Sequence, residues 1–370
     1  MGDGVANGPE TSFIPQAESL QGKEGVTLYK SNEFEVFVPK NPNIPLTEGL
    51  HIQISDGHDS EDSPKEILAR YTLALGAAKV LAESGMTRDA WANTRLEEGQ
   101  TVSVYGRVPG EENSWRKPVD TLERNSPQVD KVDPRLAELF RRYMPKWEEL
   151  SNRMELFKNG VNGRDINEVS RESVTVWESD SLKLEVILNP HLKGLHLIAS
   201  PKESFQRQWQ TVQGQDSEQV YIQQTLEATA VAMGVQKLLA EGRGEIHNSG
   251  NWASGLKVTQ EGGKLDLEKL SENRKAEKKS HRPDIAEPES QMNTGMHVHV
   301  YIPSEGPVIL PKMSKQEAIE RGRLDVVKQW EEIPPMDQTQ LEDIRVKLGE
   351  GKLTNWLEEN CKGQLKSKMT

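Results

Sequence analysis

The two halves of the 370-residue sequence resemble each other segment by segment, and this constrains the fold more than any single motif does. The matched segments are 26–29 with 174–177, 49–52 with 194–197, 79–83 with 237–241, 92–94 with 247–249, 102–109 with 296–303, and 146–150 with 329–333. Similarity that recurs in one order along a chain indicates a repeated structural unit. We therefore expect a tandem duplication, with two copies of one unit in a single chain.

Each copy begins with alternating apolar and polar residues and then changes to a helical pattern. The alternation over 26–38 and over 174–188, interrupted by Ser-Asn and Ser-Asp, is typical of antiparallel strands joined by turns. A long amphipathic segment follows in each copy and is stopped by glycine, as helices commonly are. These patterns predict the α+β class: two tandem units of antiparallel sheet with flanking helices, followed by a helical C-terminal segment.

The expected domain boundaries follow from where the copies match. The numbering offset between matched segments jumps after the second helix, which locates an insertion at 255–291 in the second copy. This insertion is rich in Lys, Glu, Ser and Pro, so it is expected to be a solvated loop, and a lid over the nearby histidines is the alternative. The other expected boundaries are a disordered tail at 1–24, a degenerate first copy at 25–150, a second copy at 170–312, and a helical segment at 313–370.

Composition narrows the classes of partner. The formal net charge of −12 disfavours binding to nucleic acid or to an anionic membrane surface, since both need a basic face. A single cysteine, Cys361, excludes an internal disulfide and a cysteine-based zinc site. No apolar stretch is long enough to span a membrane, and the Gly-rich, acidic start is unlike a signal peptide. We expect a soluble, cytoplasmic protein.

The motif that carries most chemistry is segment 291–302, QMNTGMHVHVYI. Side chains alternate along a strand, so His297, His299 and Tyr301 are expected on one face, with the intervening apolar residues packed on the other. Two imidazoles side by side on a strand form either a nucleophile with its helper or a metal clamp. Six of the eight histidines lie in this half of the chain.

Three segments of the second copy together resemble the histidine-triad superfamily. Segment 194–202 (GLHLIASPK) resembles its Gly-His strand ending in Pro-Lys, 248–250 (NSG) resembles its Asn-x-Gly turn, and 293–301 (NTGMHVHVY) resembles its closing triad strand. The resemblance covers residues 174–304, with a weaker copy over 26–110. Two such units in one chain are similar in architecture to galactose-1-phosphate uridylyltransferase and related nucleotidyl transferases.

This resemblance implies a site for the α-phosphate of a nucleotide or nucleotide conjugate, with no cofactor. His299 would be the nucleophile of a nucleotidyl-histidine intermediate, because a neutral imidazole attacks phosphorus well and later leaves it. His297 would orient the phosphate. The other residues that the resemblance places around the phosphate or ribose are His196, Asn248, Thr294, Asn293, Tyr301 and Asn189.

The sequence also departs from the pattern of the superfamily. Tyr301 stands where the third histidine is expected, Asn293 stands where a glutamine is expected, and Asn293 could replace Asn248 functionally. In the first copy, alignment through the strand-ending prolines puts Ser103, Tyr105 and Arg107 in place of the triad. We therefore expect the first copy to be structural, to supply a sheet partner, and to make the chain a monomer with an intramolecular pseudo-dimer.

Two alternatives remain open from the residues alone. A degraded motif, one copy without a nucleophile and a tyrosine in the triad fit a catalytically inactive nucleotide-binding or interaction protein. His297 and His299, with His196 or His247 and Glu245, could instead bind zinc. The spacing of the carboxylates fits zinc poorly, so the metalloenzyme is the less favoured of the two.

Overall fold

The computed structural model describes residues 25–40, 49–56, 63–83, 93–97, 101–107, 132, 134–202, 215–249, 297–311 and 315–365. The expected tail at 1–24 and the expected insertion at 255–291 lie outside these described residues, as do Asn293 and Thr294.

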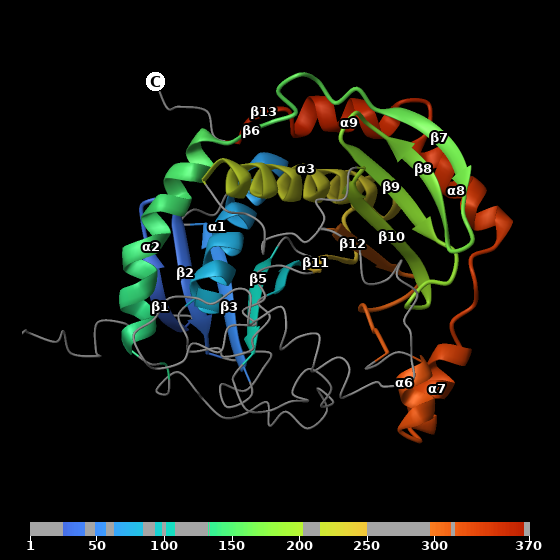
Figure 1. The fold of residues 1–370 in the computed structure, drawn as a ribbon, viewed down its shortest axis with the longest axis horizontal. Helices are drawn as coiled ribbons and strands as arrows, with labels where there is room; N and C mark the ends of the chain where they lie inside the picture. The colour runs from blue at the N-terminus through green and yellow to red at the C-terminus, as the bar shows by residue number, and fades with distance from the viewer. Residues whose placement is uncertain are drawn as a thin grey trace, which may run out of the picture.

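Eleven of the described strands form one antiparallel sheet (Figure 1), in the order β1-β2-β3-β5-β4-β11-β12-β10-β9-β8-β7. The strands are β1 (Gly25–Lys30), β2 (Phe34–Pro39), β3 (Gly49–Asp56), β4 (Asn93–Leu96), β5 (Val102–Arg107), β7 (Arg164–Val169), β8 (Ser173–Glu178), β9 (Leu182–Ile187), β10 (Gly194–Pro201), β11 (Glu245–Ser249) and β12 (His297–Pro303). A separate pair joins β6 (Glu155–Leu156) to β13 (Gly363–Gln364).

Ten of the eleven strands form two sections with the same strand order, and β7 lies at the outer edge beside β8. The strand order is β1-β2-β3-β5-β4 in the N-terminal half-sheet and β8-β9-β10-β12-β11 in the C-terminal half-sheet. In both, the last two strands along the chain exchange places in the sheet. They meet where β4 pairs with β11, through Thr94 opposite Asn248, Arg95 opposite His247, and Leu96 opposite Ile246. One chain therefore satisfies the inner edges of both half-sheets by itself, and an unpaired edge would otherwise invite another chain.

The described helices are α1 (Pro64–Glu83), α2 (Pro134–Arg153), α3 (Gln215–Ala240), α6 (Lys315–Glu320), α7 (Leu324–Glu331), α8 (Gln338–Leu348) and α9 (Lys352–Asn360). Figure 1 shows α1 beside the N-terminal half-sheet and α3 crossing the C-terminal one. The α+β class and the helical C-terminal segment are confirmed. Within the described part of the chain, no helix is long and apolar enough to cross a membrane.

Strand alternation decides which side chains meet these helices. Val298 and Val300 of β12 are completely buried on the face that α3 covers, together with Leu197 of β10. His299 and Tyr301 point to the opposite face, which we call the open face because α3 does not cover it; both side chains are nevertheless buried. The predicted division of β12 into an apolar side and a histidine side is confirmed, because successive strand side chains must alternate.

Helices α1 and α2 pack so closely that one position admits only glycine. A Cβ atom added at Gly76 of α1 would lie 2.3 Å from Cγ of Trp147, which is itself buried. Alanine normally stabilises a helix by about 1 kcal/mol over glycine, but an overpacked contact costs about 1–3 kcal/mol. Gly76→Ala should therefore lower the urea midpoint of unfolding. Trp147→Leu in the same chain should remove most of that penalty, and additive effects would contradict the contact.

Candidate functional site

Five histidines gather on the open face of the C-terminal half-sheet. They are His191 in the β9–β10 loop, His196 on β10, His247 on β11, and His297 and His299 on β12. Strand pairing accounts for most of this cluster, because residues opposite each other in an antiparallel ladder share a face. The ladder sets His196 opposite Tyr301 and His247 opposite His299.

His196 and His299 are joined directly by their ring nitrogens. Nε2 of His196 lies 2.8 Å from Nδ1 of His299, and the ring centroids are 5.0 Å apart. One nitrogen must donate and the other accept. If Nδ1–H of His299 donates, then Nε2 of His299 carries a lone pair and His196 carries its proton on Nδ1. That Nδ1 atom is buried and has no hydrogen-bond partner among the described residues.

Burial keeps this pair of histidines uncharged near neutral pH. Burial, together with the neighbouring histidines His191, His297 and His247, lowers the pKa of His196 to about 2. Burial also holds the pKa of His299 well below its usual value, with His297 and His196 as the next contributors. A neutral imidazole is the form that can attack an electrophile.

Aromatic contacts fix the orientation of the His299 ring. Tyr301 stacks nearly parallel on it, with centroids 5.4 Å apart and an interplanar angle of 8°. Tyr301 also stacks on His196 at 4.7 Å, and His297 meets His299 edge-on at 4.7 Å. Burial raises the pKa of Tyr301, so its phenol stays neutral. Tyr301 therefore acts as a packing wall for both imidazoles.

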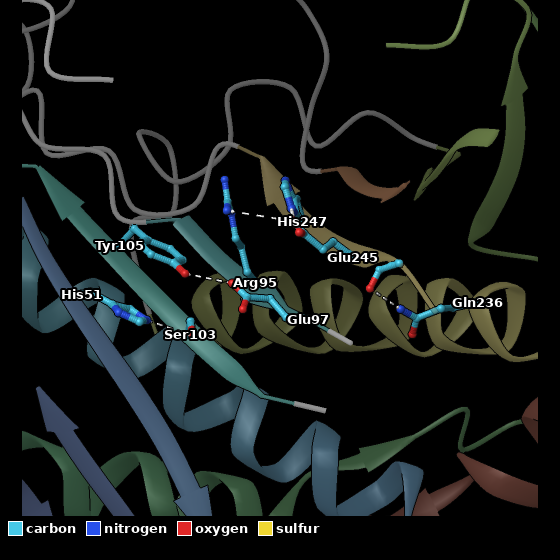
Figure 2. A network of polar contacts seen from close by, with 9 residues as sticks. His51, Arg95, Glu97, Ser103, Tyr105, Gln236, Glu245 and His247 are labelled. Atoms are coloured by element: carbon cyan, nitrogen blue, oxygen red, sulfur yellow. Dashed lines mark hydrogen bonds and ion pairs between the residues drawn. The ribbon is translucent and has the colours of Figure 1, made fainter. Parts of the chain in front are cut away.

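A polar network crosses the junction of the half-sheets (Figure 2). His247 contacts Glu245 at 2.5 Å through Nε2, and Arg95 of β4 lies 4.0 Å from the same carboxylate oxygen. Burial works to raise the pKa of Glu245, but His247 and Arg95 leave that pKa below its usual value. Burial lowers the pKa of His247, although Glu245 opposes the shift. The carboxylate is thus ionised at pH 7.

The N-terminal half-sheet holds a smaller counterpart of the histidine pair. Nε2 of His51 on β3 lies 3.1 Å from Oγ of Ser103 on β5, and His51 stacks on Tyr105 at 4.6 Å. The Tyr105 hydroxyl donates to Glu97 at 2.8 Å, and Arg95 lies over the Tyr105 ring (Figure 2). The arrangement matches His196 with His299 and Tyr301, but a serine stands where His299 stands in the C-terminal half-sheet.

The strand register corrects the alignment of the two halves. His51 pairs with Tyr105, as His196 pairs with Tyr301, so Tyr105 corresponds to Tyr301 and Ser103 to His299. The expectation that aligned Ser103, Tyr105 and Arg107 with the triad was displaced by two residues. It relied on the prolines after the strands, and these lie at different distances from the ladder positions. Both half-sheets therefore carry tyrosine at the third triad position.

Four of the residues expected at the site come together: His196, His297, His299 and Tyr301. The two expected residues Asn293 and Thr294 lie outside the described residues. The structure thus assembles the histidines of the predicted strand with the histidine of the Gly-His strand.

One expected residue, Asn248, faces away from the histidines, and another, Asn189, lies two residues before His191 of the cluster. Asn248 is buried on the helix side of the sheet, because it pairs with Val298 and with Thr94, whose hydroxyl lies 2.8 Å from that of Tyr71 in α1. Asn189 is exposed in the turn after β9. Asn248 stands one residue from a position on the open face, so strand alternation separates it from His299.

His191 and Arg95 are part of the cluster but were not predicted from the sequence, and Glu245 and His247 were expected only as possible metal ligands. His191 reaches His196 at 4.5 Å between ring centroids from an irregular loop, where no periodicity could have indicated it. Glu245 and His247 alternate along β11, so their shared face was readable. Their position opposite β12 depended on strand pairing. Among the described residues, no group of three His, Cys, Asp or Glu side chains could hold a metal ion.

Two solved uridylyltransferase structures are similar to this chain over nearly its whole length. One, described as a uridylyltransferase mutant, matches with a TM-score of 0.41 and 10% identity, covering 94% of this chain and 93% of the other. The second, described as a uridylyltransferase, matches with a TM-score of 0.39 and 11% identity, covering 97% and 96%. No protein-family model matches the sequence, and neither does any curated protein.

Proposed function

We propose that the chain transfers or hydrolyses a nucleotidyl group at the α-phosphate, with His299 as the nucleophile. The observation that carries the proposal is the buried His196–His299 pair. Its short contact of 2.8 Å joins the two ring nitrogens directly, and burial lowers the pKa of both rings so that they stay neutral. A nucleophile oriented by a second hydrogen-bonding group is the general arrangement for covalent catalysis.

The chemistry would proceed in two steps. Nε2 of His299 attacks the α-phosphorus, a nitrogen–phosphorus bond forms, and the bond to the leaving oxygen breaks with its electron pair. An acceptor, either water or a phosphate group, then attacks the same phosphorus and returns the electron pair to Nε2. In both steps Nδ1–H of His299 would donate a hydrogen bond to Nε2 of His196. This hydrogen bond would stabilise the positive charge on the His299 ring in the intermediate. His297 would contact the phosphoryl oxygens.

We also propose that residues 25–150 and 170–312 are two repeats of one unit, followed by the helical segment 313–370, and that the chain works as a monomer. The matching strand orders and the equivalent His51–Ser103 and His196–His299 contacts support this division. In the first repeat Ser103 occupies the nucleophile position without an activated imidazole, so we assign it a structural role.

The proposal is tested by trapping the intermediate. Protein is mixed with the four nucleoside 5′-monophosphates as radiolabelled p-nitrophenyl esters and quenched in base, because a phosphorus–nitrogen bond to histidine survives base and is cleaved by acid. Label that maps to a peptide containing His299 is the expected result. A protein that turns over the esters without acid-labile label would contradict the histidine mechanism.

One observation favours a second candidate function. Tyr301 is buried against both imidazoles, where a third histidine could have contacted phosphate. A nucleotide-binding protein without catalysis would tolerate this substitution. It would show a nucleotide-dependent rise in melting temperature, with no label and no release of p-nitrophenolate in the same experiment.

A further inference from the structure

The junction between the half-sheets holds a histidine–carboxylate pair that the nucleophilic step does not use. His247 of β11 faces His299 of β12 directly across the ladder, and opposite residues have Cβ atoms about 4.5–5.5 Å apart. The His247 ring also meets Tyr301 edge-on at 5.0 Å, and Tyr301 is stacked on His299. The three rings therefore form one contiguous set on the open face.

We propose that His247, held by Glu245, is the group that removes the proton from the acceptor and returns a proton to the leaving group. This rests on the proposed function, in which His299 carries the nucleotidyl group. His247 has a carboxylate partner, because its Nε2 atom lies 2.5 Å from Oε2 of Glu245.

The Glu245 contact selects the atom of His247 that can move a proton. An ionised carboxylate only accepts hydrogen bonds, so Nε2 of His247 carries the hydrogen and Nδ1 carries the lone pair. Arg95, across the strand junction and 4.0 Å from Glu245, favours the ionised carboxylate. A base oriented by a carboxylate is stabilised when it becomes an imidazolium, as general base catalysis requires.

The proton balance closes over the two steps. When water attacks the phosphorus of the intermediate, its oxygen–phosphorus bond forms, the bond to Nε2 of His299 breaks, and one water proton passes to Nδ1 of His247. In the first step of the following turnover, protonated His247 gives this proton to the leaving oxygen. The net change is hydrolysis of one phosphate ester bond, and the enzyme returns to its starting state.

The groups facing His247 come from each strand packed beside it. They are Glu245 on β11, Arg95 on β4, Glu97 directly after β4, and His297, His299 and Tyr301 on β12. In the intermediate, Nε2 of His299 is bonded to phosphorus and cannot bind a proton. The rate of the second step should therefore fall as acid protonates His247, and it should be slower in D2O.

The two steps are separated with the p-nitrophenyl nucleotide esters, whose leaving group needs no proton near neutral pH. His247→Gln should retain a burst of one p-nitrophenolate per chain and then turn over about 10²-fold more slowly than the parent. The labelled intermediate should accumulate. Azide attacks without losing a proton, so adding it should restore turnover of this variant by forming a nucleotidyl azide.

Two further variants complete the test. Glu245→Gln should slow the second step in the same direction and lose part of its pH dependence, and it covers the case in which His247→Gln fails to fold. His51→Gln replaces a buried histidine on the same face of the N-terminal half-sheet, and it should leave both steps unchanged.

If folded His247→Gln loses the burst and the turnover together, and azide does not restore turnover, the acid–base role of His247 is overturned. The role of His299 as the nucleophile would be unaffected. A normal second step in His247→Gln would overturn the acid–base role equally. A parent that gives neither a burst nor an acid-labile label would overturn the proposed function itself, and the acid–base role with it.

Discussion

Replacing His299 by alanine is expected to lower nucleotidyl transfer by about 10⁴-fold or more, the usual loss when a covalent nucleophile is removed. In the proposed reaction His299 supplies the bond to phosphorus, and no other histidine of the cluster has the hydrogen bond to His196 that orients Nε2. The measurement is the rate of product release from the labelled esters. The space left by the ring should accept free imidazole, which should restore part of the rate without labelling the protein.

A matched control comes from the other half-sheet. Ser103 occupies the position of His299 in the strand register and is completely buried, so Ser103→Ala tests a substitution at the equivalent point of the fold. Its activity should stay close to that of the parent, and its stability should fall by about 1–3 kcal/mol because the Nε2 atom of His51 loses its partner. Equal losses in both variants would indicate a general packing defect, and the role of His299 would be rejected.

The features of the site that could be predicted from sequence are those that depend on one strand. Alternation along β12 placed His297, His299 and Tyr301 on one face, because the two-residue period of a strand requires no knowledge of its neighbours. His196 followed from its place in a second motif. The α+β class followed from strand patterns that change to helical patterns in each half.

The features that could not be predicted depend on how strands pair. The register of β5 with β3 made Tyr105 the counterpart of Tyr301, and a shift by two residues preserves the face of a strand but changes every partner. Asn248 was misplaced because its motif gave no information about the face of β11. His191 and Arg95 approach the site from a loop and from the other half-sheet, and such contacts exist only in the assembled fold.

At the junction of the half-sheets, the N-terminal half-sheet contributes a charged side chain to the histidine cluster. β4 supplies Arg95 opposite His247, and the guanidinium lies over the ring of Tyr105 at 4.9 Å while it also approaches Glu245. The N-terminal half-sheet thus influences the charge of the histidine cluster without providing a nucleophile. The proposed site would therefore be incomplete without the N-terminal half-sheet, because Arg95 comes from β4.

Acidification from pH 6.5 to pH 5 is expected to destabilise the protein by several kcal/mol. Burial depresses the pKa of His51 to about 4 and of His196 to about 2. Their unfolded forms bind protons below pH 6.5 and the folded forms do not, so stability is complete above pH 6.5 and is lost as pH falls. Each of these two groups contributes about 2 kcal/mol over this interval. The pKa values of His191, His247 and His299 are also lowered by burial and add in the same direction.

The measurement is the free energy of unfolding from urea titrations at several pH values. Burial raises the pKa of Glu97 and Glu227, so these two carboxyl groups make the protein more stable as pH falls. The slope of the unfolding free energy against pH therefore shows whether the histidines outweigh these carboxyl groups. His51→Asn removes one depressed histidine outside the cluster and should reduce the slope by about 1.4 kcal/mol per pH unit. An unchanged slope in that variant would show that His51 takes up a proton in the folded state. A parent whose stability does not fall between pH 6.5 and 5 would show the same of the cluster histidines, His196 and His299 among them. The neutral His196–His299 pair would then be lost as the basis for nucleophilic attack.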